Sequence, residues 1–240
     1  MQENYLNMLI QGSKTVGAQI NHEKCQQFLK YEELLLEWNQ KINLTAITDE
    51  EGIVIKHFID SLSVNGLVTN GVRSLIDVGT GAGFPGIPLK IVREDLSVTL
   101  LDSLDKRVKF LNEVISQLTL KDIRAIHGRA EDFGILPEFR EKFDYAVARA
   151  VADLSVLCEY CLPFVKVGGT FIAMKGPLVE EEYEESRKAI LLLGGELAKT
   201  EKIFLPYSNH ERTVIVIRKY RHTPPGYPRK SGKPTKSPIK

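Results

Sequence analysis

The sequence predicts an α/β fold whose doubly wound, mostly parallel sheet ends in an antiparallel hairpin. From about residue 71 onward, short runs of β-branched residues alternate with amphipathic stretches, a pattern typical of βα units that build a parallel sheet. The last two runs are joined by the loop LPYSNHE without a helix between them, so they are expected to pair as a hairpin. The 240 residues are enough for one such core.

Residues 1–70 predict a helical extension. The segment EKCQQFLKYEELLLEWNQKI repeats apolar residues at near-helical spacing, flanked by Glu and Lys. The motif TDEE is typical of a capping box in which Thr48 is the N-cap and Glu51 reaches back to it. A further helix is therefore expected over roughly residues 50–68, with an apolar stripe facing the core.

Seven strands are expected in residues 71–220, and the hairpin ending separates this sheet from a plain dinucleotide-binding domain of six parallel strands. Helices are expected between the early strands, in DKRVKFLNEVISQL and DLSVLCEYCLPFV. The expected strands are Ser74–Val78, Ser97–Asp102, Ile123–His127, Phe143–Ala148, Gly169–Met174, Leu197–Phe204 and Arg212–Arg218.

Residues 221–240 form a basic, proline-rich tail on an acidic body. The chain carries a net charge of +1, but the stretch from Arg218 to Lys240 holds eight Lys or Arg and no acidic residue. That leaves 24 basic against 31 acidic residues elsewhere. Polyanions are the natural partner of such a basic stretch, and a disordered, solubilising terminus is the alternative.

Composition indicates a soluble protein of a reducing compartment. No apolar run reaches the roughly 18 residues that span a bilayer, and the N-terminus lacks a signal-peptide pattern. Three cysteines favour a reducing compartment over a disulfide framework, so a cytoplasmic location is expected. Cys158 and Cys161 form C-x-x-C without a second pair, and we expect buried helix thiols and no metal site.

The segment DVGTGAGFPGIP, residues 77–88, holds two glycine signatures at once. From Gly79 it contains G-x-G-x-G directly after the first strand, which suits an adenosyl cofactor such as S-adenosylmethionine. From Gly81 to Gly86 it contains G-x-G-x-x-G, the spacing of a dinucleotide fingerprint. Ligands of open parallel sheets bind at the carboxyl ends of the strands, so this turn is expected to face the cofactor in either case.

Neighbouring residues favour the adenosyl cofactor. Asp102, 23 residues beyond Gly79, is placed to accept hydrogen bonds from ribose hydroxyls, which suits both cofactors equally. Asp77 could meet a cationic amino-acid group, whereas it would repel a pyrophosphate. Ala130 and Glu131, after the third strand, stand where an adenine edge would lie.

Several motifs together carry a family resemblance, and the G-F-P-G-I-P extension is much more specific than the glycines alone. They are DVGTGAGFPGIPLKI, LLDSLDKRVKFL, GRAED, ARAVA and YPRKSGKPTKSP. Over nearly its whole length the chain resembles the ribosomal small-subunit RNA methyltransferase G family, also called glucose-inhibited division protein B. The resemblance implies a seven-stranded, Rossmann-like class I S-adenosylmethionine-dependent methyltransferase fold and methyl transfer to the N7 of a guanine in 16S ribosomal RNA. It also implies a cofactor site lined by Gly79, Phe84, Ala130, Glu131 and Arg149.

This chemistry needs little from catalytic side chains. Guanine N7 offers an in-plane lone pair that needs no deprotonation, so no dedicated general base is required. Catalysis is expected to depend on positioning and electrostatics, and Arg149 is the one catalytic candidate. Its guanidinium could bond the cofactor, stack on the base or hold a phosphate, and an ion pair with Asp153 is the structural alternative.

His57, Asp60 and Ser61 share one helix face by their spacing. We expect this polar face to pack over the mouth of the cofactor site; a plain hydrogen-bonded helix surface is the alternative. Side chains of a single helix rarely reach the geometry of a hydrolytic triad.

The tail and the sheet edge supply the expected RNA contacts. Lysine and arginine release counterions from phosphates, and tyrosine stacks on exposed bases. The expected partner is 16S ribosomal RNA or the small subunit, bound by a monomer, and truncation after Tyr220 is expected to leave cofactor affinity nearly unchanged. An NAD-dependent oxidoreductase and a noncatalytic ribosome-assembly factor are the rival functions. The candidate RNA-binding residues are Lys175, Arg218, Arg221, Tyr227, Arg229, Lys230 and Lys233.

Overall fold

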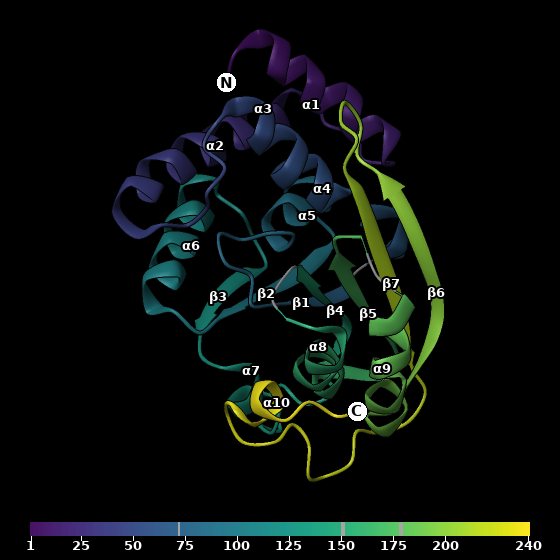
Figure 1. The fold of residues 1–240 in the computed structure, drawn as a ribbon. Coiled ribbons are helices and arrows are strands. Elements are labelled where there is room, and N and C mark those ends of the chain that lie inside the picture. The colour runs from purple at the N-terminus through teal and green to yellow at the C-terminus, as the bar shows by residue number, and fades with distance from the viewer. Residues whose placement is uncertain (72, 150–151, 178–179) are drawn as a thin grey trace.

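A seven-stranded sheet forms the centre of the molecule in the computed structural model, which describes residues 1–240 except 72, 150–151 and 178–179 (Figure 1). The strand order is β3-β2-β1-β4-β5-β7-β6. The first five strands are parallel, and β7 runs antiparallel to both of its neighbours. The predicted fold class and all seven strands are confirmed. The strands are β1 Arg73–Val78, β2 Leu96–Asp102, β3 Ile123–His127, β4 Phe143–Arg149, β5 Val165–Lys175, β6 Gly195–Phe204 and β7 Glu211–Lys219.

Helices cover both faces of the sheet, so alternate strand residues enter two different cores. Leu75 and Ile76 are neighbours in β1 and are both fully buried, yet they belong to opposite hydrophobic clusters. The Leu75 cluster packs under α5 and α6, and the Ile76 cluster packs under α8 and α9 (Figure 1). The helices of this region are α5 Gly86–Val92, α6 Asp105–Gln117, α7 Ala130–Phe133, α8 Leu154–Cys161, the 3₁₀ turn η3 Leu162–Phe164, α9 Glu180–Leu192 and α10 Lys233–Lys236.

The N-terminal helices share the core of the sheet. Phe28 and Tyr31 of α2 pack against Phe58, and Tyr31 also contacts Phe84 of the glycine turn. Helical structure is present in this segment as predicted, but it is built into the same hydrophobic cluster as β1 and α5. The elements are α1 Glu3–Thr15, α2 His22–Ile42, α3 Glu50–Gly52, the π-helical η1 Ile53–Ile59, α4 Asp60–Leu62 and the 3₁₀ turn η2 Asn65–Leu67.

The predicted capping box is wrong by one residue. Asp49, not Thr48, is the N-cap, and its carboxylate accepts a hydrogen bond from the Gly52 backbone N–H at 2.7 Å. The helix that follows changes to π geometry over Ile53–Ile59 and ends at Leu62, short of the expected residue 68. Asp and Thr are both good N-caps, so the residue pattern alone does not decide between Thr48 and Asp49.

The C-terminal segment is folded against the protein surface rather than extended. It runs from the end of β7 beneath α9, α8 and α7 (Figure 1, yellow), and α10 packs on α8. Pro234 and Ile239 are buried there. None of the helices in the described part of the chain is long and apolar enough to cross a membrane.

Candidate cofactor site

The turn after β1 presents bare backbone at the carboxyl edge of the sheet. Gly79, Gly81 and Gly83 all have positive φ, at 70°, 61° and 98°, a region that favours glycine. The Gly79 N–H donates to the Leu101 carbonyl oxygen at 2.8 Å, which ties the turn to the end of β2. A β-carbon on Gly81 would meet nothing within 4 Å, so the turn is open on that side.

Asp77 is a fully buried carboxylate beneath this turn. Its Oδ2 accepts hydrogen bonds from Thr80 Oγ1 at 2.6 Å and from the Gly86 N–H at 2.8 Å. Its Oδ1 is buried with no hydrogen-bond partner, and burial raises the pKa of Asp77 to about 6. An orphaned anionic oxygen beside an open glycine turn fits a cationic ligand and opposes a pyrophosphate.

Asp102 holds the backbone of the turns around the end of β2. It lies at the end of β2 as predicted, but only 2% of its surface is exposed. Its Oδ2 accepts from the Gly81 N–H at 2.8 Å, and its Oδ1 accepts from the Leu104 N–H at 2.9 Å. Both carboxylate oxygens therefore hold the backbone of adjacent turns, and the Arg107 guanidinium lies 3.5 Å from Oδ2.

A pocket of about 210 Å³ opens beside the glycine turn at the carboxyl ends of β1, β2 and β3. Three of the predicted cofactor residues line it: Gly79, Ala130 and Glu131. Sequence reasoning missed other lining residues, namely Ser103, Tyr160 and Thr235. Ser103 directly follows Asp102, which the sequence placed at the end of the second strand. Thr235 belongs to the tail, and no local pattern indicated that it would line a pocket.

Arg149 and Phe84 lie in a cluster with the polar face of the η1–α4 helix. The Arg149 guanidinium carbon lies 4.9 Å from the Phe84 ring centroid, and His57 stacks on the same ring at 4.6 Å. Asp60 accepts from Arg149 at 3.0 Å and from Arg212 at 3.1 Å. Asp60 thus replaces Asp153 as the ion-pair partner considered for Arg149, and Arg212 is a further member that the sequence did not reveal.

This cluster does not contain a hydrolytic triad. Ser61 Oγ donates to the His57 backbone carbonyl rather than to its ring. Burial, with the Arg149 charge next in size, lowers the pKa of His57 to about 3, so the imidazole is neutral at physiological pH. His57 Nε2 lies 2.8 Å from Thr45 Oγ1, which joins the loop after α2 to the same face.

Four of the seven predicted RNA-binding residues make contacts within the protein. Lys175 pairs with Glu182 at 2.7 Å and Arg229 with Glu159 at 2.6 Å. Arg221 donates to the Leu191 carbonyl oxygen, and the half-buried Tyr227 packs against the core under α8. In the structure these side chains bind other parts of the protein, and the charge pattern alone did not indicate such contacts.

The other three, Arg218, Lys230 and Lys233, are exposed. Arg218 pairs in register with Thr170 of β5 and lines a hollow with Thr69 and Arg73, which places it toward the start of β1, at the edge opposite the glycine turn. Lys230 and Lys233 flank Gly232, whose N–H donates to Glu131 of the pocket at 2.9 Å. Of the three, only these two lysines lie near the candidate cofactor site.

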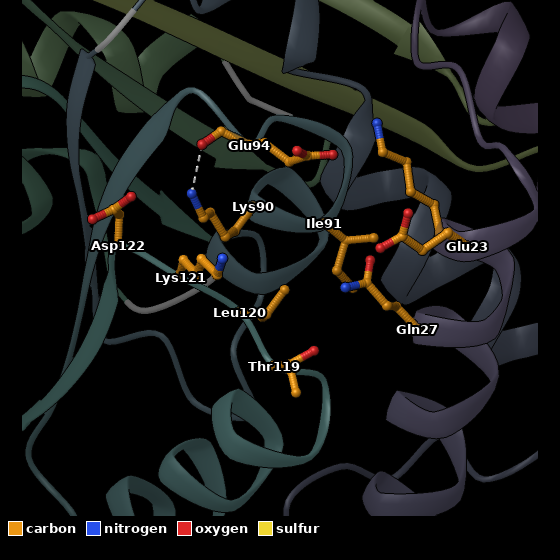
Figure 2. A pocket seen from close by; sticks show the side chains of 10 residues that line it. Glu23, Gln27, Lys90, Ile91, Glu94, Thr119, Leu120, Lys121 and Asp122 are labelled. Atoms are coloured by element: carbon orange, nitrogen blue, oxygen red, sulfur yellow. Dashed lines mark hydrogen bonds between the residues drawn. The ribbon is translucent and has the colours of Figure 1, made fainter.

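A second hollow, of about 410 Å³, lies at the amino ends of β2 and β3 between α2 and the α6–β3 loop (Figure 2). Lys90 points into this region, but its ammonium donates to the backbone carbonyls of Glu94 and Leu96 at 2.8 and 2.6 Å. The wall mixes acidic and basic side chains, including Glu23 and Asp122. No glycine lines this hollow, whereas Gly79 and Gly128 line the smaller pocket.

Cys158 and Cys161 are fully buried in and at the end of α8, which confirms the interpretation as helix thiols. Burial raises the pKa of both thiols. Among the described residues, no group of three or more His, Cys, Asp and Glu side chains could hold a metal ion.

Known proteins resemble this chain at both the sequence and the structural level. Residues 24–210 match the family model described as rRNA small subunit methyltransferase G. Ribosomal RNA small subunit methyltransferase G of Acetivibrio thermocellus is 57% identical, over 97% of this chain and 96% of that protein. The protein of the same name from Alkaliphilus metalliredigens is 53% identical, over 97% and 98%.

Solved structures resemble it in fold. A SAM-dependent methyltransferase from Aquifex aeolicus superposes with a TM-score of 0.55 at 16% identity, over 73% of this chain and 96% of that one. M. jannaschii TYW2 in complex with AdoMet gives a TM-score of 0.53 at 16% identity, over 67% and 76%. At this level of identity the likeness concerns the fold alone.

Proposed function

The chain belongs to the rRNA small subunit methyltransferase G family, and from that premise we propose that it transfers a methyl group from S-adenosylmethionine to the N7 of a guanine in 16S ribosomal RNA. The observation that carries this function at the residue level is the pocket beside Gly79, bounded by Ala130 and Glu131. Asp77, whose Oδ1 is buried without a hydrogen-bond partner, lies two residues before Gly79 in the chain. The protein is an S-adenosylmethionine-dependent enzyme that acts on ribosomal RNA.

The residues of the pocket fit this cofactor. S-adenosylmethionine supplies an electrophilic methyl group on a sulfonium centre. The open backbone at Gly79 and Gly81 admits a ligand closely, and the buried charge of Asp77 favours a cationic group at that end. Ala130 and Glu131 bound the other end of the pocket, where we place the adenine.

The protein contributes alignment more than proton transfer. Because guanine N7 carries a free lone pair, the chain needs no base, and the neutral His57 is consistent with that. Arg149 is held over Phe84 by Asp60 and by the Lys56 carbonyl oxygen at 3.1 Å. We assign Arg149 to the wall that orients the cofactor and the incoming base, and Asp60 as the positioning residue that fixes its guanidinium.

The RNA reaches the carboxyl edge of the sheet. Lys230 and Lys233 are exposed beside the pocket, and their charges suit phosphates of an RNA strand entering there. We propose further that the enzyme acts as a monomer in the cytoplasm, where its ribosomal RNA substrate is made.

Methyl transfer can be tested with labelled cofactor and three substrates: naked 16S RNA, an assembly intermediate and the complete small subunit. The expected product is one N7-methylguanine, mapped by cleavage at the modified base. Thermal shifts with S-adenosylhomocysteine and NADH form the second arm, and only the first should stabilise the protein. Stabilisation by NADH would favour an oxidoreductase, and cofactor binding without label transfer to any RNA form would favour a noncatalytic assembly factor.

A further inference from the structure

The C-terminal segment is anchored to the protein by buried polar contacts. Arg140 donates to the carbonyl oxygens of Thr223 and Tyr227, each at 2.7 Å. Arg229 holds Glu159 through three hydrogen bonds of 2.6–3.1 Å, and Glu159 is only 1% exposed. Removing one partner of such a buried ion pair would leave the other charge unpaired. The position of this segment is therefore determined by the fold.

These anchors bring residues 232–236 to the rim of the pocket beside the glycine turn. The Gly232 N–H donates to Glu131 Oε1 at 2.9 Å, so a cofactor-pocket residue itself holds the segment. Gly232 has a φ of 77° and starts the turn into α10, whose Pro234 is buried. Thr235, one residue later, lines the pocket.

Helix α8 contributes a pocket residue, Tyr160, that contacts the tail. Tyr160 of α8 lines the pocket together with Ala130 and Thr235. Burial is the main cause that raises the pKa of Tyr160, with the negative charges of Glu131 and Glu159 next, and a hydrogen bond to Thr235 works against them. Strand ends form the floor of this pocket, and α8 and the tail enclose its outer side.

We propose that Gly232, Pro234 and Thr235 form the outer wall of the adenosyl pocket, with Thr235 as the residue that faces the cofactor. This inference rests on the proposed function, because it takes S-adenosylmethionine as the occupant. It assigns to the tail a part in cofactor binding that differs from the expectation of an RNA-binding arm. Truncation after Tyr220 should consequently weaken cofactor binding as well, contrary to the expectation from the sequence.

The decisive variant is Thr235→Trp, which would fill the pocket from its rim. Thr235 is exposed, so an added side chain should leave the ligand-free protein folded, and Lys236→Trp on the same short helix is the matched control. Lys236 is exposed and does not line the pocket. Thr235→Ser keeps the hydroxyl and serves as the conservative variant.

Calorimetry with S-adenosylhomocysteine measures the affinity of each protein, and melting without ligand checks the fold. We expect Thr235→Trp to weaken binding at least tenfold, which corresponds to about 1.4 kcal/mol. The affinities of Lys236→Trp and Thr235→Ser should stay within about twofold of the parent protein. Equal affinity of Thr235→Trp and the parent protein would overturn this inference alone. Failure of the parent protein to bind would overturn the proposed function and the inference together.

A measurement on the unmodified protein gives an independent test. Trypsin can cut after Lys230 and Lys236, which are exposed, whereas Lys233 precedes a proline. Bound S-adenosylhomocysteine should slow both cuts at least fivefold and leave cleavage at Lys199, exposed on the distant strand β6, unchanged. Identical slowing at all three sites would show general stabilisation and contradict a specific wall.

Discussion

Replacing Asp77 by asparagine is expected to stabilise the ligand-free protein and to weaken cofactor binding. The Asp77 side chain is fully buried, and burial raises its pKa from 3.8 to about 6 despite the hydrogen bonds from Thr80 and Gly86. The ionised carboxylate is therefore less stable in the fold than in the unfolded chain. Asparagine keeps a carbonyl acceptor for Thr80 and Gly86 without the charge.

The magnitude follows from linkage between proton binding and folding. The pKa of Asp77 is higher in the folded protein than in the unfolded chain. Asp77 therefore contributes its full stabilisation below pH 3.8, and this contribution is lost as the pH rises to about 6. The difference between the two values corresponds to about 3 kcal/mol above pH 6. The Asp77→Asn variant should gain up to about this amount over the parent protein at pH 7.5 and almost nothing near pH 4.

Urea unfolding at several pH values measures this difference, and calorimetry at pH 7.5 measures the affinity for S-adenosylmethionine. Asp95→Asn is the control of opposite sign, because the Arg93 hydrogen bonds lower the pKa of Asp95, so its removal should cost stability as the pH rises. If Asp77→Asn proved less stable than the parent at pH 7.5, or bound S-adenosylmethionine equally well, the role given to Asp77 would be wrong.

Three further substitutions test the surroundings of the site. Asp60→Asn removes the charge that fixes two arginines, and kcat/KM should fall about tenfold or more while the pH profile keeps its shape; an unchanged kcat/KM would exclude a positioning role. Glu159→Gln removes the buried charge that pairs with the partly exposed Arg229, so chemical unfolding should show a loss of about 2 kcal/mol, and calorimetry should show weaker S-adenosylhomocysteine binding; stability within error of the parent would contradict the anchor. Replacing Lys230 and Lys233 by alanine should leave cofactor affinity unchanged and reduce the salt dependence of RNA binding by about two counterions, measured by filter binding; parallel salt plots would refute these contacts.

Local sequence patterns were sufficient to predict the sheet and the glycine turn. Strand periodicity depends on residues two apart, so all seven strands were predicted, and Ile123–His127 was predicted to the residue. The start of β5 was missed by four residues, since Val165 joins the strand through a register shift opposite Phe143 that no periodicity encodes. Gly79 and Gly81 were identified because positive φ at those positions leaves a compositional signature.

Long-range partners were not predictable in the same way. Arg149 was identified as a site residue, but its candidate partner was the nearby Asp153, whereas the structure pairs it with Asp60, 89 residues away. Asp102 was placed correctly at a strand end, yet the direction of its carboxylate depends on the path of the glycine turn. Charge composition described the tail as basic without showing that Glu159 neutralises Arg229.

The sequence by itself determined the fold class, the family and the edge of the sheet that carries the glycine turn, because these follow from periodicity and from motifs within a few residues of one another. Only the tertiary structure decided which side chains enclose the pocket. Thr235 lines the same pocket as Ala130 and Gly79 because partly buried contacts of Arg140, Glu159 and Glu131 direct the returning chain. Such contacts join residues that are distant along the chain, and their geometry exists only after the core has packed.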